Sequence, residues 1–396
     1  MTGIAQNTTE VPAHPAFSLK PLMFETFVCW MAMMAFVALA GPIARVIGLQ
    51  PWQVGTAMTT AGVAWMVMAR IWGVASDRRG RRKVLLFGLG GFAISYFLLS
   101  LFIDVALRTA MPPLLAFAGL VIGRGIAGAF YTAVPVTGAA LVADHVPAES
   151  RAGAMAGLGA AGGAGMVIGP ALAGLMAPYG LSVPLYFTAI LPVVALAVLW
   201  RVLPRQERHA PPKTRPLRWS DQRLRLPMMM AFAAVFSISA AQIVVGFFAL
   251  DRLHLDPVDA ARTAGIALAA VGLAMITAQL MLRRLGWPPA RLIRVGSLIS
   301  AIGFGAATLA GNAPLLWAAY AIGAFGMGWI TPSVSALAAN AVEPHEQGAA
   351  AGTISAAQGL GVILGPIIGT SLYTLDNRLP YALIGVMLLA TLLRRD

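Results

Sequence analysis

The sequence predicts an all-α membrane protein with twelve transmembrane helices arranged as two six-helix bundles. Two features of its composition predict the membrane class, because 59% of the 396 residues are hydrophobic and only 11% are charged. The mean hydropathy is +0.78, whereas soluble domains are about a quarter charged and about half apolar. A third observation, the resemblance between the two halves of the chain, predicts the two bundles.

Apolar stretches divide the chain into membrane spans. A bilayer core about 30 Å thick requires about 20 apolar residues of helix, and twelve stretches of roughly that length fit the sequence. They cover residues 22–44, 53–75, 84–103, 113–138, 151–177, 183–203, 227–250, 262–282, 291–311, 314–338, 347–373 and 379–393. We therefore expect short connections between most spans, with the basic segment at 76–83 forming the loop between spans 2 and 3.

The basic residues are distributed unevenly between the two sides of such a membrane protein. In this arrangement, 22 of the 28 Lys and Arg residues fall on the side of the two termini, five fall on the other side, and Arg124 lies within a span. Cytoplasmic segments are enriched in Lys and Arg. We expect a multi-pass protein of the bacterial inner membrane with both termini in the cytoplasm. The net charge of +13 is then a signal of topology and of contact with lipid, not of nucleic-acid binding.

The longest hydrophilic stretch, at 204–225, separates six spans from six. It is basic and rich in proline, which favours a linker lying on the anionic inner leaflet. We expect an N-terminal six-helix bundle over 1–203, a cytoplasmic linker over 204–225 and a C-terminal six-helix bundle over 226–396. Nothing in the sequence calls for a second copy, and we expect a monomer.

The two predicted bundles carry matching segments at matching positions. Spans 1 and 7 are followed by RVIGLQPWQVG (45–55) and DRLHLDPVDAARTAG (251–265), and spans 5 and 11 contain GMVIGPALAG (165–174) and GVILGPIIGT (361–370). Because each half has an even number of spans, both halves have the same orientation. Their symmetry axis then lies along the membrane normal, an arrangement that permits alternating access by rocking.

Glycines at a spacing of four residues, with adjacent Gly-Pro pairs, occur in spans 5 and 11. Small residues allow close helix packing in lipid, and a proline inside a helix removes a hydrogen bond and permits a bend. We interpret these positions both as tight packing and as a hinge where the halves meet. They are Gly165, Gly169, Pro170, Gly174, Gly365 and Pro366.

The sequence contains no convincing enzyme motif. The string GLGAAG (157–162) matches a dinucleotide fingerprint but lies within a span and follows no strand, and no GxxxxGK[ST], HExxH, GxSxG or zinc-spaced Cys/His set occurs. We expect no metal and no cofactor. The protein is predicted to be a secondary transporter that draws on a gradient, rather than an enzyme.

Ionisable residues within spans are costly and therefore indicate function. Arg124 lies midway along span 4 and Glu25 lies about one turn inside span 1, while the matching positions of the other half are apolar. We predict that both are functional residues and that Glu25 can carry a proton. Two other interpretations stay open: Glu25 could reach cytoplasmic water, and Arg124 could be a structural partner of backbone carbonyls or a carboxylate.

A set of polar, aromatic and methionine side chains could line a central cavity. Such a set would suit a tolerant hydrophobic pocket, although each residue could instead face lipid or a neighbouring helix. The residues are Trp30, Met33, Met34, Tyr131, Gln242, Phe247, Trp329 and Gln358.

The stretch GVASDRRGRRKV (73–84) resembles the loop signature of the major facilitator superfamily, with Ala75 where leucine is usual. Arg124 and Gly128 resemble the span-4 signature of proton-linked members, with Ala127 in place of glutamine, and this resemblance implies that Arg124 takes part in proton coupling. Residues 165–174 resemble the span-5 signature of drug/proton antiporters. The resemblance implies that the span 2–3 loop forms a conformational latch with the opposite half. Its residues are Gly73, Asp77, Arg78, Gly80, Arg81 and Arg82.

Together, the residues and the resemblance predict a proton-coupled antiporter that exports a small amphipathic compound, a drug or a metabolite, by rocker-switch alternating access. Its partners are the small-molecule substrate and protons. The alternatives are an exporter dedicated to one metabolite or siderophore, an uptake symporter, and a membrane sensor that transports nothing.

Overall fold

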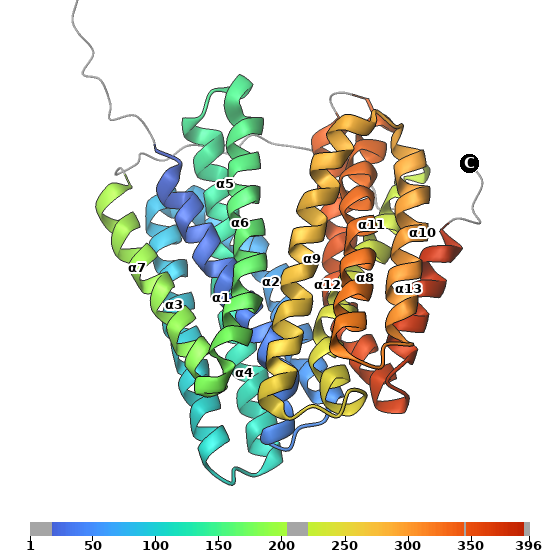
Figure 1. The fold of residues 1–396 in the computed structure, drawn as a ribbon. Coiled ribbons are helices and arrows are strands. Elements are labelled where there is room, and N and C mark those ends of the chain that lie inside the picture. The colour runs from blue at the N-terminus through green and yellow to red at the C-terminus, as the bar shows by residue number, and fades with distance from the viewer. Residues whose placement is uncertain (1–17, 204–220, 344–345, 392–396) are drawn as a thin grey trace, which may run out of the picture.

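The computed structural model describes residues 18–203, 221–343 and 346–391, and nearly all of these are helical. The expected linker at 204–225 lies almost entirely outside the described residues. Figure 1 shows two groups of helices that stand side by side and lie closest to each other near one end of the molecule. This all-α architecture confirms the predicted fold class.

The N-terminal half contains seven helical segments and one short 3-10 turn in its described residues. They are α1 (Lys20–Val46), α2 (Pro51–Arg79), α3 (Arg81–Arg108), α4 (Pro113–Tyr131), α5 (Ala133–His145), α6 (Ala148–Met176), η1 (Ala177–Tyr179) and α7 (Val183–Val202). The described part of the C-terminal half follows the same plan. It has η2 (Gln222–Leu224), α8 (Arg225–Asp251), α9 (Pro257–Leu285), α10 (Pro289–Ala307), α11 (Ala313–Asn340), α12 (Gln347–Leu375) and α13 (Leu379–Ala390).

Eleven helical segments of the described chain are long and apolar enough to cross a membrane, and α13 is a shorter apolar helix. Predicted span 4 corresponds to α4 and α5 together. Pro135 explains the break between them, because it has no N–H to donate to the carbonyl of Tyr131 and its ring crowds that carbonyl. The hydroxyl of Thr132, at the junction, donates to the carbonyl oxygen of Gly128 at 2.8 Å.

The expected loop at 76–83 is wrong, because helix occupies nearly all of it. Helix α2 continues through Arg79 and α3 begins at Arg81, so that Gly80 alone separates them. Gly80 has φ +94°, a conformation that side chains disfavour. Arg78 and Arg79 lie in the last turn of α2, where cations interact favourably with the helix dipole.

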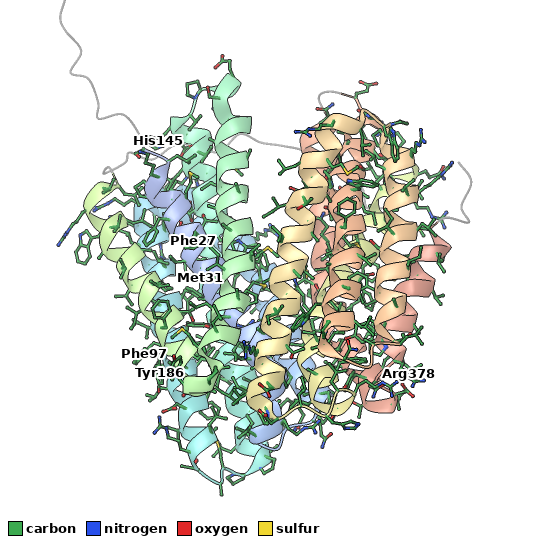
Figure 2. All side chains as sticks on the ribbon, viewed as in Figure 1. Phe27, Met31, Phe97, His145, Tyr186 and Arg378 are labelled. Atoms are coloured by element: carbon green, nitrogen blue, oxygen red, sulfur yellow. The ribbon has the colours of Figure 1, made fainter. Side chains whose placement is uncertain are left out.

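The connections define two faces of the molecule. One face, which we call the basic face, holds the start of α1, the α2–α3 junction and the ends of α7 and α13, and the other is the opposite face (Figure 1). In Figure 2, His145 lies towards the basic face and Arg378 lies at the opposite face. There, Asp256 caps α9 by accepting hydrogen bonds from the backbone of Asp259 and Val258, which lowers the pKa of its carboxyl group.

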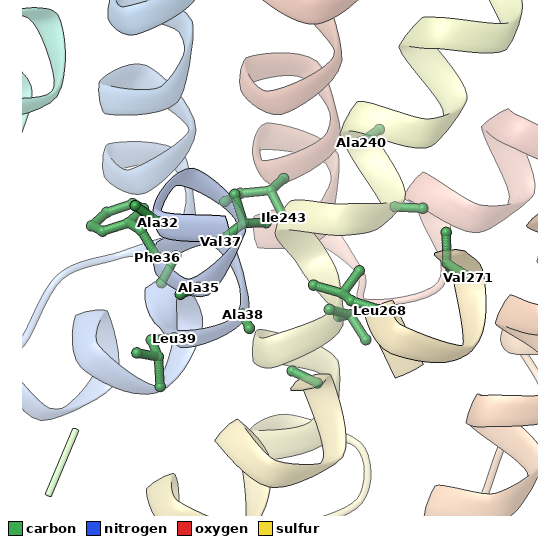
Figure 3. Close-up of a cluster of buried hydrophobic side chains, with 14 of the residues drawn as sticks. Ala32, Ala35, Phe36, Val37, Ala38, Leu39, Ala240, Ile243, Leu268 and Val271 are labelled. Atoms are coloured by element: carbon green, nitrogen blue, oxygen red, sulfur yellow. The ribbon is translucent and has the colours of Figure 1, made fainter. Parts of the chain in front are cut away.

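Large apolar side chains are exposed around the outside of both halves. Leu114, Phe87, Ile94 and Leu309 have exposed fractions of 76%, 64%, 64% and 78%. An exposed apolar surface of this extent is typical of contact with lipid rather than with water. Inside the molecule, apolar side chains of α1 and α8 lie together where the halves meet, including Val37 and Ile243 (Figure 3).

Candidate functional site

A cavity of about 260 Å³ lies between the two halves. Helices α1, α2, α4 and α6 line it from the N-terminal half, and α8 and α12 line it from the C-terminal half. The lining residues are Trp30, Met33, Met34, Val37, Met58, Ala61, Gly62, Trp65, Arg124, Gly128, Tyr131, Met166, Val235, Ile238, Ser239, Gln242, Ile243, Val362 and Pro366. Because both halves contribute, their relative movement would change the cavity.

The lining follows helical periodicity. On α4, Arg124, Gly128 and Tyr131 are spaced by four and three residues, which places them on one face of the helix. Gly128 lies so close to α2 that an added Cβ atom would come within 2.8 Å of the carbonyl oxygen of Ala61. The glycine therefore allows α4 to approach α2 and brings Arg124 and Tyr131 to the cavity wall.

Arg124 is buried, with an exposed fraction of 2%. Its Nη1 atom lies 3.6 Å from the sulfur of Met33, and its guanidinium carbon lies 4.4 Å from the centre of the Phe36 ring. Its Nε atom has no hydrogen-bond partner among the described residues. A thioether and an aromatic face are weak partners for a buried cation, so these contacts satisfy the guanidinium poorly.

Aromatic rings surround the hydroxyphenyl group of Tyr131. The rings of Trp30 and Trp65 meet it edge to face at centroid distances of 6.2 and 6.0 Å, and the ring of Phe92 lies 5.4 Å away. Edge-to-face pairs of this kind are favourable and hold the rings in defined orientations. The N-terminal half thus presents a preformed aromatic wall.

Glu25 is fully enclosed in the N-terminal half, with an exposed fraction of 1%. The alternative in which it reaches water is therefore wrong for this conformation. Its Oε1 atom has no hydrogen-bond partner among the described residues, and it is not part of the cavity lining. Met33, which contacts Arg124, lies eight residues further along α1, a helix rise of about 12 Å. The structure does not join Glu25 and Arg124 in an ion pair.

Five of the expected cavity residues line the cavity: Trp30, Met33, Met34, Tyr131 and Gln242. Phe247 does not, because it lies where α8 is already pressed against α1 and it is completely buried beside Tyr373. Trp329 also lies elsewhere, and its indole N–H donates to the carbonyl of Ala278. Gln358 is on α12 but outside the lining.

Sequence reasoning missed several lining residues on α2 and α6, including Trp65, Met58 and Met166. A signal for two of them was present, since Met58 and Trp65 are seven residues apart and share a helix face with Gly62. The signal is weak in a span, because apolar and aromatic residues occur on lipid-facing surfaces as well.

Close contacts between the halves gather towards the opposite face. Gly41 of α1 lies against the backbone of Gly246 on α8, Gly174 of α6 lies against Gly265 on α9, and Gly55 of α2 lies against Thr370 on α12. Towards the basic face, Gly159 of α6 and Gly352 of α12 have open space where a side chain would lie. Figure 1 shows that α6 and α9 move apart towards the basic face.

Polar contacts between the halves reinforce this closed end. Arg45 of α1 forms an ion pair with Asp251 of α8. Within the C-terminal half, the hydroxyl of Tyr373 on α12 donates to the other carboxylate oxygen of Asp251 at 3.0 Å and so helps to hold this carboxylate in place. Deeper in the molecule, the hydroxyl of Thr59 on α2 donates to the carbonyl of Ile363 on α12 at 2.6 Å. We call the two side-chain contacts across the halves, made by Arg45 and Thr59, together with the glycine contacts, the outer seal.

The predicted hinge residues divide into two groups. Gly165 and Gly169 lie against the backbone of α1 near Phe27 and Met31, residues that Figure 2 places along α1, and Gly365 lies against α8. Each of these contacts joins two helices of the same half. Three others reach the partner half: the carbonyl of Pro170 and Gly174 face Gly265, and the carbonyl of Pro366 faces Gly55.

The predicted latch residues lie within the N-terminal half. Asp77 forms an ion pair with Arg81, and Arg81 also contacts Asp144 of α5 at 3.1 Å. Arg82 donates to the carbonyl of Trp200 at 2.6 Å, and Gly73 faces Val136. In this conformation these contacts do not join Asp77 to a helix end of the opposite half, and the latch stays a prediction. Arg78 and Gly80 complete the junction.

Nothing in the described chain forms a group of three or more His, Cys, Asp or Glu side chains that could hold a metal ion. The chemistry that the cavity offers is binding: an apolar surface of methionine and aromatic side chains, two neutral polar groups at Ser239 and Gln242, and one cation.

Comparison with known proteins identifies the family. The sequence model of the Major Facilitator Superfamily matches residues 22–298 and 260–395. The chain belongs to the Major Facilitator Superfamily. Among solved structures of this fold, a bacterial homologue of the human lysosomal transporter Spinster superposes with a TM-score of 0.75 at 14% identity, covering 94% of each chain.

Two curated relatives are named for drug resistance. Multidrug resistance protein 2 of Bacillus subtilis (strain 168) is 24% identical over 386 residues, which cover 94% of this chain and 92% of that protein. The class G tetracycline resistance protein of Vibrio anguillarum is 29% identical over 343 residues, which cover 81% of this chain and 80% of that protein. The match extends over most of both halves.

Proposed function

We propose that this protein exports a small amphipathic compound from the cytoplasm in exchange for protons. The observation that carries the proposal is the cavity itself, which both halves line next to the outer seal and which contains a buried cation without a strong partner. The names of the relatives support export of drug-like compounds.

The proposed mechanism is a rocker switch. Contacts between the halves are concentrated towards the opposite face, so this conformation corresponds to access from the basic face. We assign the basic face to the cytoplasm because Lys and Arg are enriched there. Breaking the outer seal while closing the helices near the basic face would carry bound substrate outward.

The proposed proton path involves two buried groups. Glu25 and Arg124 are buried ionisable residues within spans, and because such a position is costly, residues that occupy it usually serve function. Proton entry would change the charge of Glu25 while Arg124 stays in the cavity wall. Because the two side chains are not paired, coupling between them would pass through the intervening turns of α1.

Transport in inverted membrane vesicles tests the proposal. The vesicles would hold the full chain and an acidic interior, and uptake of three probes would be measured: the cation ethidium, the zwitterion tetracycline and the anion 2-naphthylacetate. We expect accumulation of at least one probe above that in vesicles without the protein, and its collapse on adding a protonophore. Accumulation that persists with the protonophore would contradict proton coupling.

A further inference from the structure

The charge in the described cavity lining is positive and comes from the N-terminal half. Among the described residues that line the cavity, Arg124 is the only charged one, and those of the C-terminal half are apolar apart from Ser239 and Gln242. None of the ion pairs among the described residues includes Arg124. In a wall of such low polarity a single charge is poorly screened, so the cavity attracts anions and repels cations.

The guanidinium group of Arg124 also lacks the partner that its geometry favours. Buried arginines normally make charge-assisted, often bidentate hydrogen bonds to carboxylates. Here Nη1 meets a sulfur atom at 3.6 Å and Nε meets no acceptor in the described chain. A ligand carboxylate or a similar acidic group would supply the missing acceptor oxygens.

The rest of the cavity indicates the body of such a ligand. Trp30, Trp65 and Tyr131 form an aromatic wall, and four methionines supply flexible apolar surface: Met33, Met34, Met58 and Met166. Flat apolar groups fit surfaces of this kind. The volume of about 260 Å³ accommodates a compound of two or three fused rings rather than a large one.

We propose that the substrates of this protein are amphipathic organic anions, each with a flat apolar body and one acidic group that binds Arg124. This inference rests on the proposed function for its transport meaning, since it names the substrate class of the same cavity. It differs from the expectation for an exporter of cations, for which a carboxylate in the cavity lining would be favourable and a buried arginine unfavourable.

Equilibrium binding to the purified full chain tests the substrate class without any proton gradient. Three probes share one ring system and differ in charge at pH 7.5: 2-naphthylacetate, 2-naphthylacetamide and 2-naphthylethylammonium. We expect the acetate to bind about tenfold to a hundredfold more tightly than the neutral acetamide, which is the range for a hydrogen bond to a buried charge. The ammonium compound should bind most weakly. Equal binding of all three, or tightest binding of the ammonium compound, would overturn the proposal.

Substitutions of Arg124 test whether this residue causes the preference for the anionic probe. Arg124→Gln should bring acetate binding down to that of the acetamide while acetamide binding stays within about twofold, and Arg124→Lys should keep part of the preference. Arg108→Gln is the matched control, because Arg108 is exposed at the opposite face. An unchanged preference in Arg124→Gln would overturn the assignment to this residue. If that variant does not fold, the binding order of the unmodified protein still decides the substrate class.

The two proposals can fail separately. Tightest binding of the acetate together with transport that ignores a protonophore would contradict proton antiport and leave the substrate class standing. Proton-driven accumulation of ethidium without accumulation of 2-naphthylacetate would contradict the substrate class and leave the antiport standing.

Discussion

Arg124 supplies a charge to the cavity lining but has few contacts that support the fold. Its side-chain partners are the sulfur of Met33 and the ring of Phe36, and both are apolar groups that need no cation. Removing one member of a buried ion pair is costly because it leaves the other charge unpaired. Replacing Arg124 would leave no such charge unpaired, so the burial of this residue is better explained by function than by stability.

We predict that Arg124→Gln abolishes gradient-driven transport and leaves the protein folded. Glutamine keeps much of the side-chain volume and removes the charge, so the free energy of unfolding should change by less than about 1.5 kcal/mol. Uptake in vesicles and thermal unfolding in detergent measure the two effects. Full transport activity in this variant would remove Arg124 from the proposed mechanism.

Glu25 leads to a prediction about pH. Glutamine has nearly the same shape but cannot bind or release a proton, so Glu25→Gln should flatten the dependence of transport rate on pH between about 5 and 8. The control is Glu149→Gln, because Glu149 is exposed at the start of α6. Identical pH profiles for the unmodified protein and Glu25→Gln would show that this carboxyl group does not carry the coupled proton.

At the scale of single helices, the glycines of α6 and α12 determine how tightly each half packs. Helix α6 packs along α1, and α12 packs along α8, which are equivalent pairs in the two halves. Gly169 faces the backbone of Met31, where a side chain has no room, while Gly159 of the same helix faces open space. The same residue type therefore has different roles along one helix.

This difference predicts unequal effects of alanine. In Gly169→Ala, the added Cβ atom would overlap the carbonyl oxygen of Met31, would lie 3.1 Å from the Cα atom of that residue, and would push α6 away from α1. We expect a loss of about 1–3 kcal/mol in unfolding free energy, the usual range for overpacking. Gly159→Ala should be neutral or slightly stabilising because alanine favours helix. Equal unfolding midpoints for the two variants in a denaturant series would contradict this account.

At the scale of the whole molecule, the outer seal holds the two halves together at one end. Gly41 and Gly246 bring α1 and α8 into backbone contact, and the ion pair between Arg45 and Asp251 lies just beyond them. The side chains of Arg45 and Asp251 are 46% and 29% exposed. An ion pair so close to water contributes modestly, which suits a contact that must break in each cycle.

We predict that Asp251→Asn shifts the population towards conformations open at the opposite face. Loss of a partly exposed ion pair worth about 0.5–1 kcal/mol changes the ratio of two conformations roughly two- to fivefold. Spin labels at positions 108 and 309, in a Cys29→Ser background, would report this as a longer distance between the halves. The exposed Asp259 gives the control Asp259→Asn, and equal distance distributions in both variants would contradict the role of the seal.

The sequence by itself determined the membrane class, the helices, the repeat and the residues that stand out chemically. Long apolar stretches can cross a bilayer only as helices or closed barrels, and a charge such as Arg124 is conspicuous among them. Five cavity residues were predictable for the same reason. The helical α2–α3 junction was not, because charged residues at helix ends and in loops look alike in sequence.

Only the tertiary structure decided which faces of the helices meet. Helical periodicity places Met58, Gly62 and Trp65 on one face, but in a span every face is apolar, so the sequence does not show whether that face meets lipid, a neighbour or a cavity. The fold also separated glycines that pack within a half from those in the outer seal. It enclosed Glu25 and left Arg124 without a carboxylate partner, because burial and pairing depend on neighbours that lie far apart in the chain.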